Sequence, residues 1–163
     1  MRSKNIFFLS AILSAALFSC TKTSTVGKNA DNLPAIPVTV QNAMAYRPEA
    51  TVSTSKSAGG NIQIILSIPS GSGHTIKEIT KVAASTSFTQ IQSGGSTGFY
   101  TSAPIAANGT TATFTTTLTE YIAKAGGTIP ASNTELAKRF YFLITLDDGS
   151  TIVTSPVRVL VLD

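Results

Sequence analysis

The fold is decided by residues 139–162, which read RFYFLITLDDGSTIVTSPVRVLVL. Apolar and polar residues alternate in this segment, as they do in a β-strand with one buried face. The positions predicted to face inward are Phe140, Phe142, Ile144 and Leu146. Asp147-Asp148-Gly149-Ser150 then supplies the residue types of a tight hairpin turn. We therefore expect the chain to turn here and to return as an antiparallel strand over Thr151–Leu162.

Pro156 interrupts the returning strand. A proline has no N–H group to donate to a neighbouring strand, so the strand is either at a sheet edge or bulged at this point. Beyond the proline, the inward face is resumed by Val157, Val159 and Val161. The pattern predicts that Phe140–Leu146 and Val157–Leu162 are buried antiparallel neighbours.

Two further segments show the same alternation. The predicted inward positions are Ile62, Ile64, Leu66 and Ile68 in Asn61–Pro69, and Ala112, Phe114, Thr116 and Leu118 in Thr110–Leu118. The outward threonines of the second segment fit a solvated strand face better than a ligand array, because branched side chains suit the pleated surface. Weaker strands are predicted at Val38–Gln41, Thr51–Ser55, Ile76–Ala83 and Gly98–Ala103.

Helical signals are few. Thr119–Ala125 can form one or two turns that end at Gly126-Gly127, and Asn133–Lys138 can form another. About six to eight short strands separated by turn residues are typical of an antiparallel sandwich. The sequence therefore predicts an all-β fold, an antiparallel β-sandwich with one or two short helical turns.

The N-terminus carries the pattern of a secretion signal. Arg2 and Lys4 give it a positive start, and Ile6–Leu17 is an uncharged apolar run. The run is too short for a permanent transmembrane helix, which needs about 20 apolar residues. It is followed by Leu17-Phe18-Ser19-Cys20, which contains the one cysteine of the chain.

This ending resembles the lipobox of bacterial lipoproteins, in which the cysteine is lipidated and becomes the first residue of the mature chain. The resemblance implies that residues 1–19 are removed and that Cys20 holds the protein on a membrane. Acyl chains contribute about 0.8 kcal/mol per buried CH₂, so two or three of them are a firm anchor. The residue after the cysteine is Thr21 rather than aspartate. This implies an outer-membrane location, with the periplasmic face favoured over the cell surface. The alternative is an ordinary secretory signal with an incidental cysteine.

Composition limits the remaining chain. Residues 20–37 are small and polar and predict a flexible tether, which leaves residues 38–163 for the β domain. Without the two basic residues of the signal, ten basic and eight acidic residues give a formal net charge of +2. The basic residues are scattered, which argues against nucleic-acid binding. One cysteine and one histidine are too few for a disulfide framework or a clustered zinc site, so no metal or cofactor is predicted.

The last quarter of the chain resembles the final hairpin of immunoglobulin-like and fibronectin-type-III-like modules found in lipoproteins of the Bacteroidota type. The resemblance rests on the alternation and turn of residues 140–163, and it implies an immunoglobulin-like sandwich. The long stretch between Leu118 and Phe140 departs from the compact module.

Candidate catalytic residues are few. His74 follows Ser70-Gly71-Ser72-Gly73, where it is either an exposed loop histidine or a general base working with Ser72 or a distant aspartate. Asp147 and Asp148 are turn residues, with calcium ligands or a catalytic pair as alternatives. The aromatic residues that could form a carbohydrate platform, or pack in the core instead, are Phe99, Tyr100, Tyr121 and Tyr141.

Two functions are weighed on this basis. The favoured one is a lipid-anchored, non-enzymatic binding or accessory module of the cell envelope, attached to the membrane through Cys20, with a protein or a glycan as its partner. The alternative is a small envelope hydrolase that uses His74.

Overall fold

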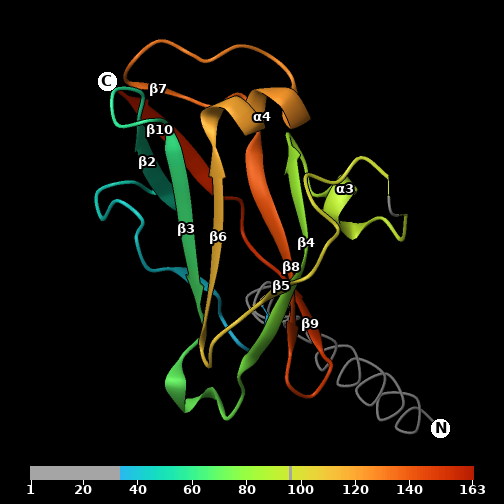
Figure 1. Ribbon diagram of the computed structural model, residues 1–163. Coiled ribbons are helices and arrows are strands. Elements are labelled where there is room, and N and C mark those ends of the chain that lie inside the picture. Colours follow the sequence, from blue (N-terminus) through green and yellow to red (C-terminus); the bar gives the residue numbers. More distant parts are fainter. Residues whose placement is uncertain (1–33, 96) are drawn as a thin grey trace, which may run out of the picture. The chain divides into compact units, whose positions relative to one another are not determined.

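The computed structural model describes residues 34–95 and 97–163, which form mostly strands in antiparallel sheets with few helices (Figure 1). The predicted all-β class is confirmed. Residues Ala35–Asp163 make up one compact unit. Among the described residues, no helix has the length and apolar character needed to cross a bilayer.

The first sheet has three strands in the order β1-β3-β6. They are β1 (Thr39–Val40), β3 (Asn61–Ser67) and β6 (Thr111–Thr117). All eight predicted inward positions of Asn61–Pro69 and Thr110–Leu118 are buried. The alternation of apolar and polar residues thus fixed which face of each strand turns inward, as a period of two requires.

The second sheet has four strands in the order β5-β4-β8-β9. They are β5 (Ile105–Ala106), β4 (Ile76–Ser85), β8 (Arg139–Leu146) and β9 (Thr151–Val153). The predicted turn joins β8 to β9, and Gly149 adopts the positive φ of 83° that the turn requires. Phe140, Phe142 and Ile144 are fully buried, as predicted.

The third sheet corrects a prediction. It consists of β2 (Thr51–Ser55), β10 (Arg158–Leu162) and β7 (Thr134–Glu135), and β10 runs parallel to β2. Only Val157 pairs with β8, through a single bridge to Phe140, so the expected pairing of Val157–Leu162 with β8 is wrong beyond that point. Thr154–Val157, which contains Pro156, separates β9 from β10, and after this break the chain moves to β2.

Within residues 34–95 and 97–163, helices occur in three short segments. They are the 3₁₀ turn Ser70–Ser72, α3 (Thr89–Gln92) and α4 (Leu118–Ala125). Helix α4 was predicted, and it ends at Gly126 and Gly127, whose φ angles of 79° and 96° cannot continue a helix.

Two predicted elements are wrong. Asn133–Lys138 is not helical, because backbone bonds from Asn133 to Val161 and from Leu136 to Val159 draw the segment against β10. Gly98–Ala103 is not a strand either: it forms one bridge, from Thr101 to Val82, and the strand follows at Ile105–Ala106.

The hydrophobic core lies where side chains of all three sheets meet. The Phe114 ring of the first sheet lies 5.3 Å from Phe140 and 5.4 Å from Phe142 of the second, measured between ring centroids. Val159 and Val161 of β10 belong to the same cluster. Aromatic contacts of this kind add about 0.5–1.5 kcal/mol each beyond the area that they bury.

Candidate functional site

Arg158 is the centre of a charged network at the start of β10. Parallel pairing sets Arg158 beside Thr51, and the Arg158 N–H donates to the Ala50 carbonyl at 2.9 Å. This places Glu49, on the loop before β2, within reach of the guanidinium group of Arg158. Residues 109 positions apart in sequence are thus brought together by one strand pairing.

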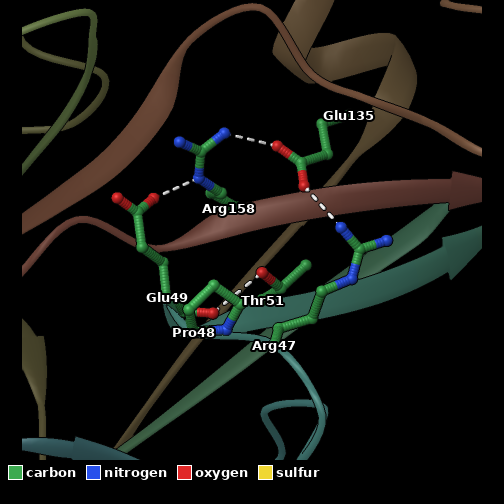
Figure 2. A pocket seen from close by; sticks show the side chains of 6 residues that line it. All are labelled: Arg47, Pro48, Glu49, Thr51, Glu135 and Arg158. Atoms are coloured by element: carbon green, nitrogen blue, oxygen red, sulfur yellow. Dashed lines mark hydrogen bonds and ion pairs between the residues drawn. The ribbon is translucent and has the colours of Figure 1, made fainter.

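Two carboxylates and two guanidinium groups alternate in this network (Figure 2). Arg158 donates through Nε to Glu49 and through Nη1 to Glu135, the latter at 2.5 Å. The other carboxylate oxygen of Glu135 accepts from Arg47 at 3.1 Å. Glu135 therefore bridges two arginines and ties β7 to both β10 and the loop before β2.

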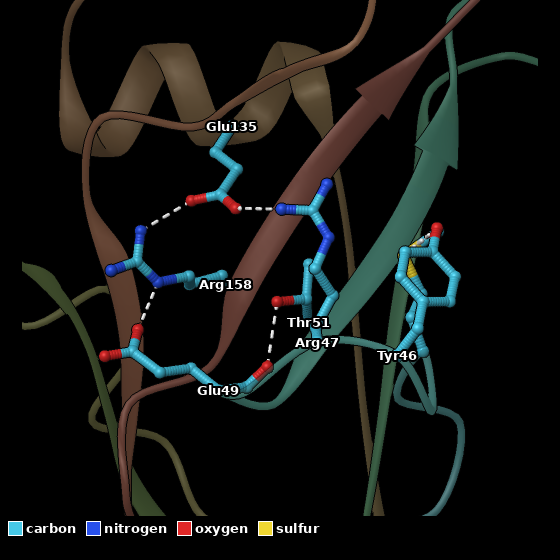
Figure 3. A network of polar contacts seen from close by, with 7 residues as sticks. Tyr46, Arg47, Glu49, Thr51, Glu135 and Arg158 are labelled. Carbon is cyan, nitrogen blue, oxygen red and sulfur yellow. Dashed lines mark hydrogen bonds and ion pairs between the residues drawn. The ribbon is translucent and has the colours of Figure 1, made fainter.

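The network borders an open pocket of about 290 Å³. Its lining residues are Arg47, Pro48, Glu49, Thr51, Glu135 and Arg158. The hydroxyl of Thr51 donates to the carbonyl of Glu49 at 3.0 Å, which holds the pocket's loop against β2 (Figure 3). Tyr46, 74% exposed, stands beside the pocket, and the Arg47 guanidinium carbon lies 5.9 Å from its ring centroid.

The charges in the pocket compensate one another. The hydrogen bond from Arg158 lowers the pKa of Glu49, and the bonds to Glu49 and Glu135 raise the pKa of Arg158. An arginine has five N–H groups, so N–H donors remain beyond those bonded to the glutamates. Since the four charges sum to zero, the pocket suits an uncharged polar ligand, such as a glycan hydroxyl, better than an anion.

His74 forms a second polar cluster with the β8–β9 turn. Its Nδ1 lies 3.0 Å from Asp147 Oδ1 and 3.8 Å from Asp148 Oδ2. The hydrogen bond from His74 lowers the pKa of Asp147, and bonds from Ser150 lower the pKa of Asp148. Asp147, 73 residues away in sequence, is thus the distant aspartate that the sequence left open as a partner for His74.

His74 and Asp147 form the histidine–carboxylate pair that catalytic triads contain. The hydroxyl of Ser72 lies 3.3 Å from the backbone N of His74, from which it accepts a hydrogen bond, so it serves the loop backbone rather than the imidazole ring. Asp148 accepts from the backbone and hydroxyl of Ser150, which is the role predicted for a turn residue. The ligand atoms of His74, Asp147 and Asp148 lie within 4.8 Å of one another. A metal would have to replace the His74–Asp147 hydrogen bond.

The aromatic candidates mostly pack inside. Tyr100, Tyr121 and Tyr141 are buried, and Phe99 is half-buried. Among the described residues, the exposed rings are those of Tyr46, 74% exposed, and Phe88, 40% exposed, and the sequence pointed to neither. The sequence did not point to Arg47, Glu49, Glu135 and Arg158 either, because charged residues that are isolated in sequence carry no signal that the fold brings them together.

The predicted anchor lies outside the described residues. This applies to Cys20, to the signal of residues 1–19 and to most of the tether. No protein-family model, curated protein or solved structure matches this chain.

Proposed function

We propose that this chain is a lipid-anchored protein of the cell envelope whose β domain is a non-enzymatic binding or accessory module. The observation that carries the proposal is the N-terminal sequence, in which the one cysteine of the chain directly follows a basic start, an apolar run and Leu17-Phe18-Ser19. The anchor sits on the outer membrane, with the domain on the periplasmic face.

The domain itself is proposed to be an immunoglobulin-like sandwich. Such folds place strands A, B and E in one sheet and strands C, F and G in the other. The order β1-β3-β6 against β4-β8-β9 supports this assignment. The segment between β6 and β8, which holds α4 and β7, is an addition to the compact module.

A binding role is supported by the charge-compensated pocket before β2. Its neutral network and the exposed Tyr46 ring suit a glycan, since sugar faces pack on aromatic rings while hydroxyls bond planar polar groups. A protein partner is the second occupant that this surface would serve.

Mass spectrometry of the mature protein tests the anchor. We expect the first residue to be Cys20 carrying a diacylglycerol, and the Cys20→Ser variant to lack the added mass and to keep its signal. An unmodified mature chain that starts at another residue would refute the proposal.

The alternative is a hydrolase that uses His74, and the 3.0 Å contact with Asp147 is the observation that favours it. A general base contributes about 10² to 10⁴ in rate. If ester or glycoside hydrolysis by the purified chain fell by that factor in a folded His74→Ala variant, the protein would be a hydrolase and not a binding module. We expect no such activity to be lost.

A further inference from the structure

In the part of the chain that the structure describes, strand β6 is an open sheet edge. In the order β1-β3-β6 it has a hydrogen-bonded neighbour on one side. It is seven residues long, whereas β1, β5 and β7 have two residues each, β9 has three and β2 has five. Folded proteins usually keep edge strands short or charged, because the free N–H and C=O groups of a long edge recruit another strand.

The pairing with β3 determines which backbone N–H and C=O groups of β6 point toward β3 and which point away from the sheet. The N–H of Ile68 donates to the carbonyl of Thr110, and the N–H of Leu118 donates to that of Gly60. Hydrogen-bonded pairs alternate along an antiparallel ladder. Ala112, Phe114 and Thr116 therefore direct their backbone groups toward β3, while Thr113 and Thr115 direct theirs away from it.

At the opposite edge of the same sheet, the outward backbone groups are covered. There the backbone groups of the odd-numbered residues of β3 point toward β1. Because β1 is only two residues long, the side chain of Asn42 bonds to the backbone groups of β3 that β1 does not reach. Asn42 donates to the carbonyl of Gln63 at 2.8 Å and accepts from the N–H of Ile65 at 3.0 Å. For Thr113 and Thr115, neither the backbone bonds nor the side-chain bonds found within residues 34–95 and 97–163 give such a cover.

The open edge carries no charged residue, and it has a threonine on each side of Phe114. Residues 110–118 read TTATFTTTL and carry no charge. The side chains of Thr113 and Thr115 are exposed and stand on either side of Phe114, which points into the core. A second copy of the same edge, turned by 180°, therefore offers the same threonines and the same free groups to the first.

We propose that β6 pairs antiparallel with β6 of a second copy of this chain. A two-fold axis at Phe114 sets Thr113 of one copy opposite Thr115 of the other, and the same pair repeats across the axis. These pairs use the N–H and C=O groups of both threonines, which gives four backbone hydrogen bonds. The two three-stranded sheets become one sheet of six strands.

The pairing closes at two copies. An interface between identical patches is isologous, and each copy uses the free backbone groups of its Thr113 and Thr115 in this one pairing. Threonine side chains that face each other across strands add a favourable contact. No lysine or glutamate on β6 repels the second copy, unlike the charged residues that protect natural edges.

Cysteine pairing tests the register. In full-length chains that carry Cys20→Ser, we combine a Thr113→Cys variant with a Thr115→Cys variant under mild oxidation. Directly opposed residues have Cα atoms about 5.5 Å apart, which suits a disulfide. Two chains of the same variant set their cysteines diagonally, about 7–8 Å apart, which does not. We expect cross-linked dimer in the mixture and little with either variant alone. Equal cross-linking in all three samples, or none, would overturn the proposal.

A proline variant tests the backbone bonds independently. Thr115→Pro removes an N–H group that points away from β3, so the pairing of β3 with β6 keeps its bonds. Thr115→Val is the matched control, since it keeps the N–H group. By sedimentation over a concentration series, we expect the Cys20→Ser chain and its valine variant to dimerise and the proline variant to stay monomeric, with thermal melting confirming that it is folded. Should the proline variant melt as unfolded, Thr115→Lys takes its place. Monomers throughout, or dimers that persist in the folded edge variant, would show that this edge is not the interface.

Discussion

Phe142 shows how much one buried residue contributes. Its side chain is fully buried on β8 and contacts the rings of Phe114 and Phe140. Removing a buried phenylalanine ring leaves a cavity, so Phe142→Ala should lower the free energy of unfolding by about 3–5 kcal/mol. Phe88→Ala is the matched control, because Phe88 is 40% exposed and should cost much less. Urea denaturation of both variants measures the difference, and a loss below about 1 kcal/mol for Phe142→Ala would contradict the buried position.

Glu135 tests the charged network at the same scale. Glu135→Gln removes the ion pairs with both Arg47 and Arg158. Partly exposed ion pairs contribute about 0–1 kcal/mol each, so we expect a loss of about 1 kcal/mol at low salt. The loss should shrink in 1 M NaCl, where the screening length is about 3 Å. Glu78→Gln removes the same charge from β4 and serves as the control. A loss that does not change with salt would mean that the effect is not electrostatic.

Helix α4 begins with a side-chain cap. Thr117 Oγ1 accepts a hydrogen bond from the backbone N–H of Glu120 at 3.1 Å, which satisfies one of the free N–H groups of the first turn. Thr117→Ala should therefore cost about 1 kcal/mol of stability, within a range of about 0.5–2 kcal/mol. Thr117→Ser keeps the hydroxyl group and should recover most of the loss in the same thermal melts. Equal losses in the two variants would assign the effect to the methyl group instead.

Elements whose signal is local were predictable. The period of two in β3, β6 and β8 reports burial along one strand, and the pair Gly126-Gly127 reports the end of α4, so each could be read from a few consecutive residues. The parallel pairing of β10 with β2 could not, because partners about a hundred residues apart leave no trace in either strand. The same holds for the Glu49–Arg158 contact, which is a consequence of that pairing.

The sequence of β7 was misread for a related reason. Residues 133–138 have reasonable helical residue types, but the buried side chain of Leu136 and the backbone bonds to Val159 and Val161 hold the segment against β10, with Thr134–Glu135 as a short strand. Tertiary packing here overrides a weak local preference. For His74, likewise, the orienting carboxylate came from a turn 73 residues away.

At the scale of the whole molecule, charged contacts connect loops to distant strands and make stability depend on acid. The partners of Asp147 and Glu49, namely His74 and Arg158, lower the pKa of each carboxyl group. A carboxyl group with a lowered folded-state pKa stabilises the fold above its unfolded pKa, and this contribution is lost as the pH falls through the folded value. The melting temperature should therefore fall below about pH 4. Asp147→Asn should flatten this decrease and Glu78→Gln should not; identical curves for the two variants would contradict the role of His74.

Tyr100, one of the buried tyrosines, makes stability depend on alkaline pH as well. Tyr100 is 6% exposed, and its hydroxyl lies 2.5 Å from the hydroxyl of Thr116. Burial raises the pKa of Tyr100 to about 12 from an ordinary value near 10. Because the folded state holds the proton more tightly, the contribution is complete below about pH 10 and is lost as the pH rises toward 12.

The hydroxyl of Tyr100 affects stability in two ways, through its bond to Thr116 and through its raised pKa, and replacing the tyrosine separates them. Tyr100→Phe should lower the melting temperature at pH 7, since the Thr116 hydroxyl loses the bond to Tyr100 and keeps only its bond to Glu120. The same substitution should reduce the further decrease between pH 10 and 12. Tyr46→Phe is the control, because Tyr46 is 74% exposed and lies outside the core. Thermal melts from pH 7 to 12 compare the three chains. If Tyr100→Phe loses stability above pH 10 as steeply as the unchanged chain, the alkaline transition belongs to another group.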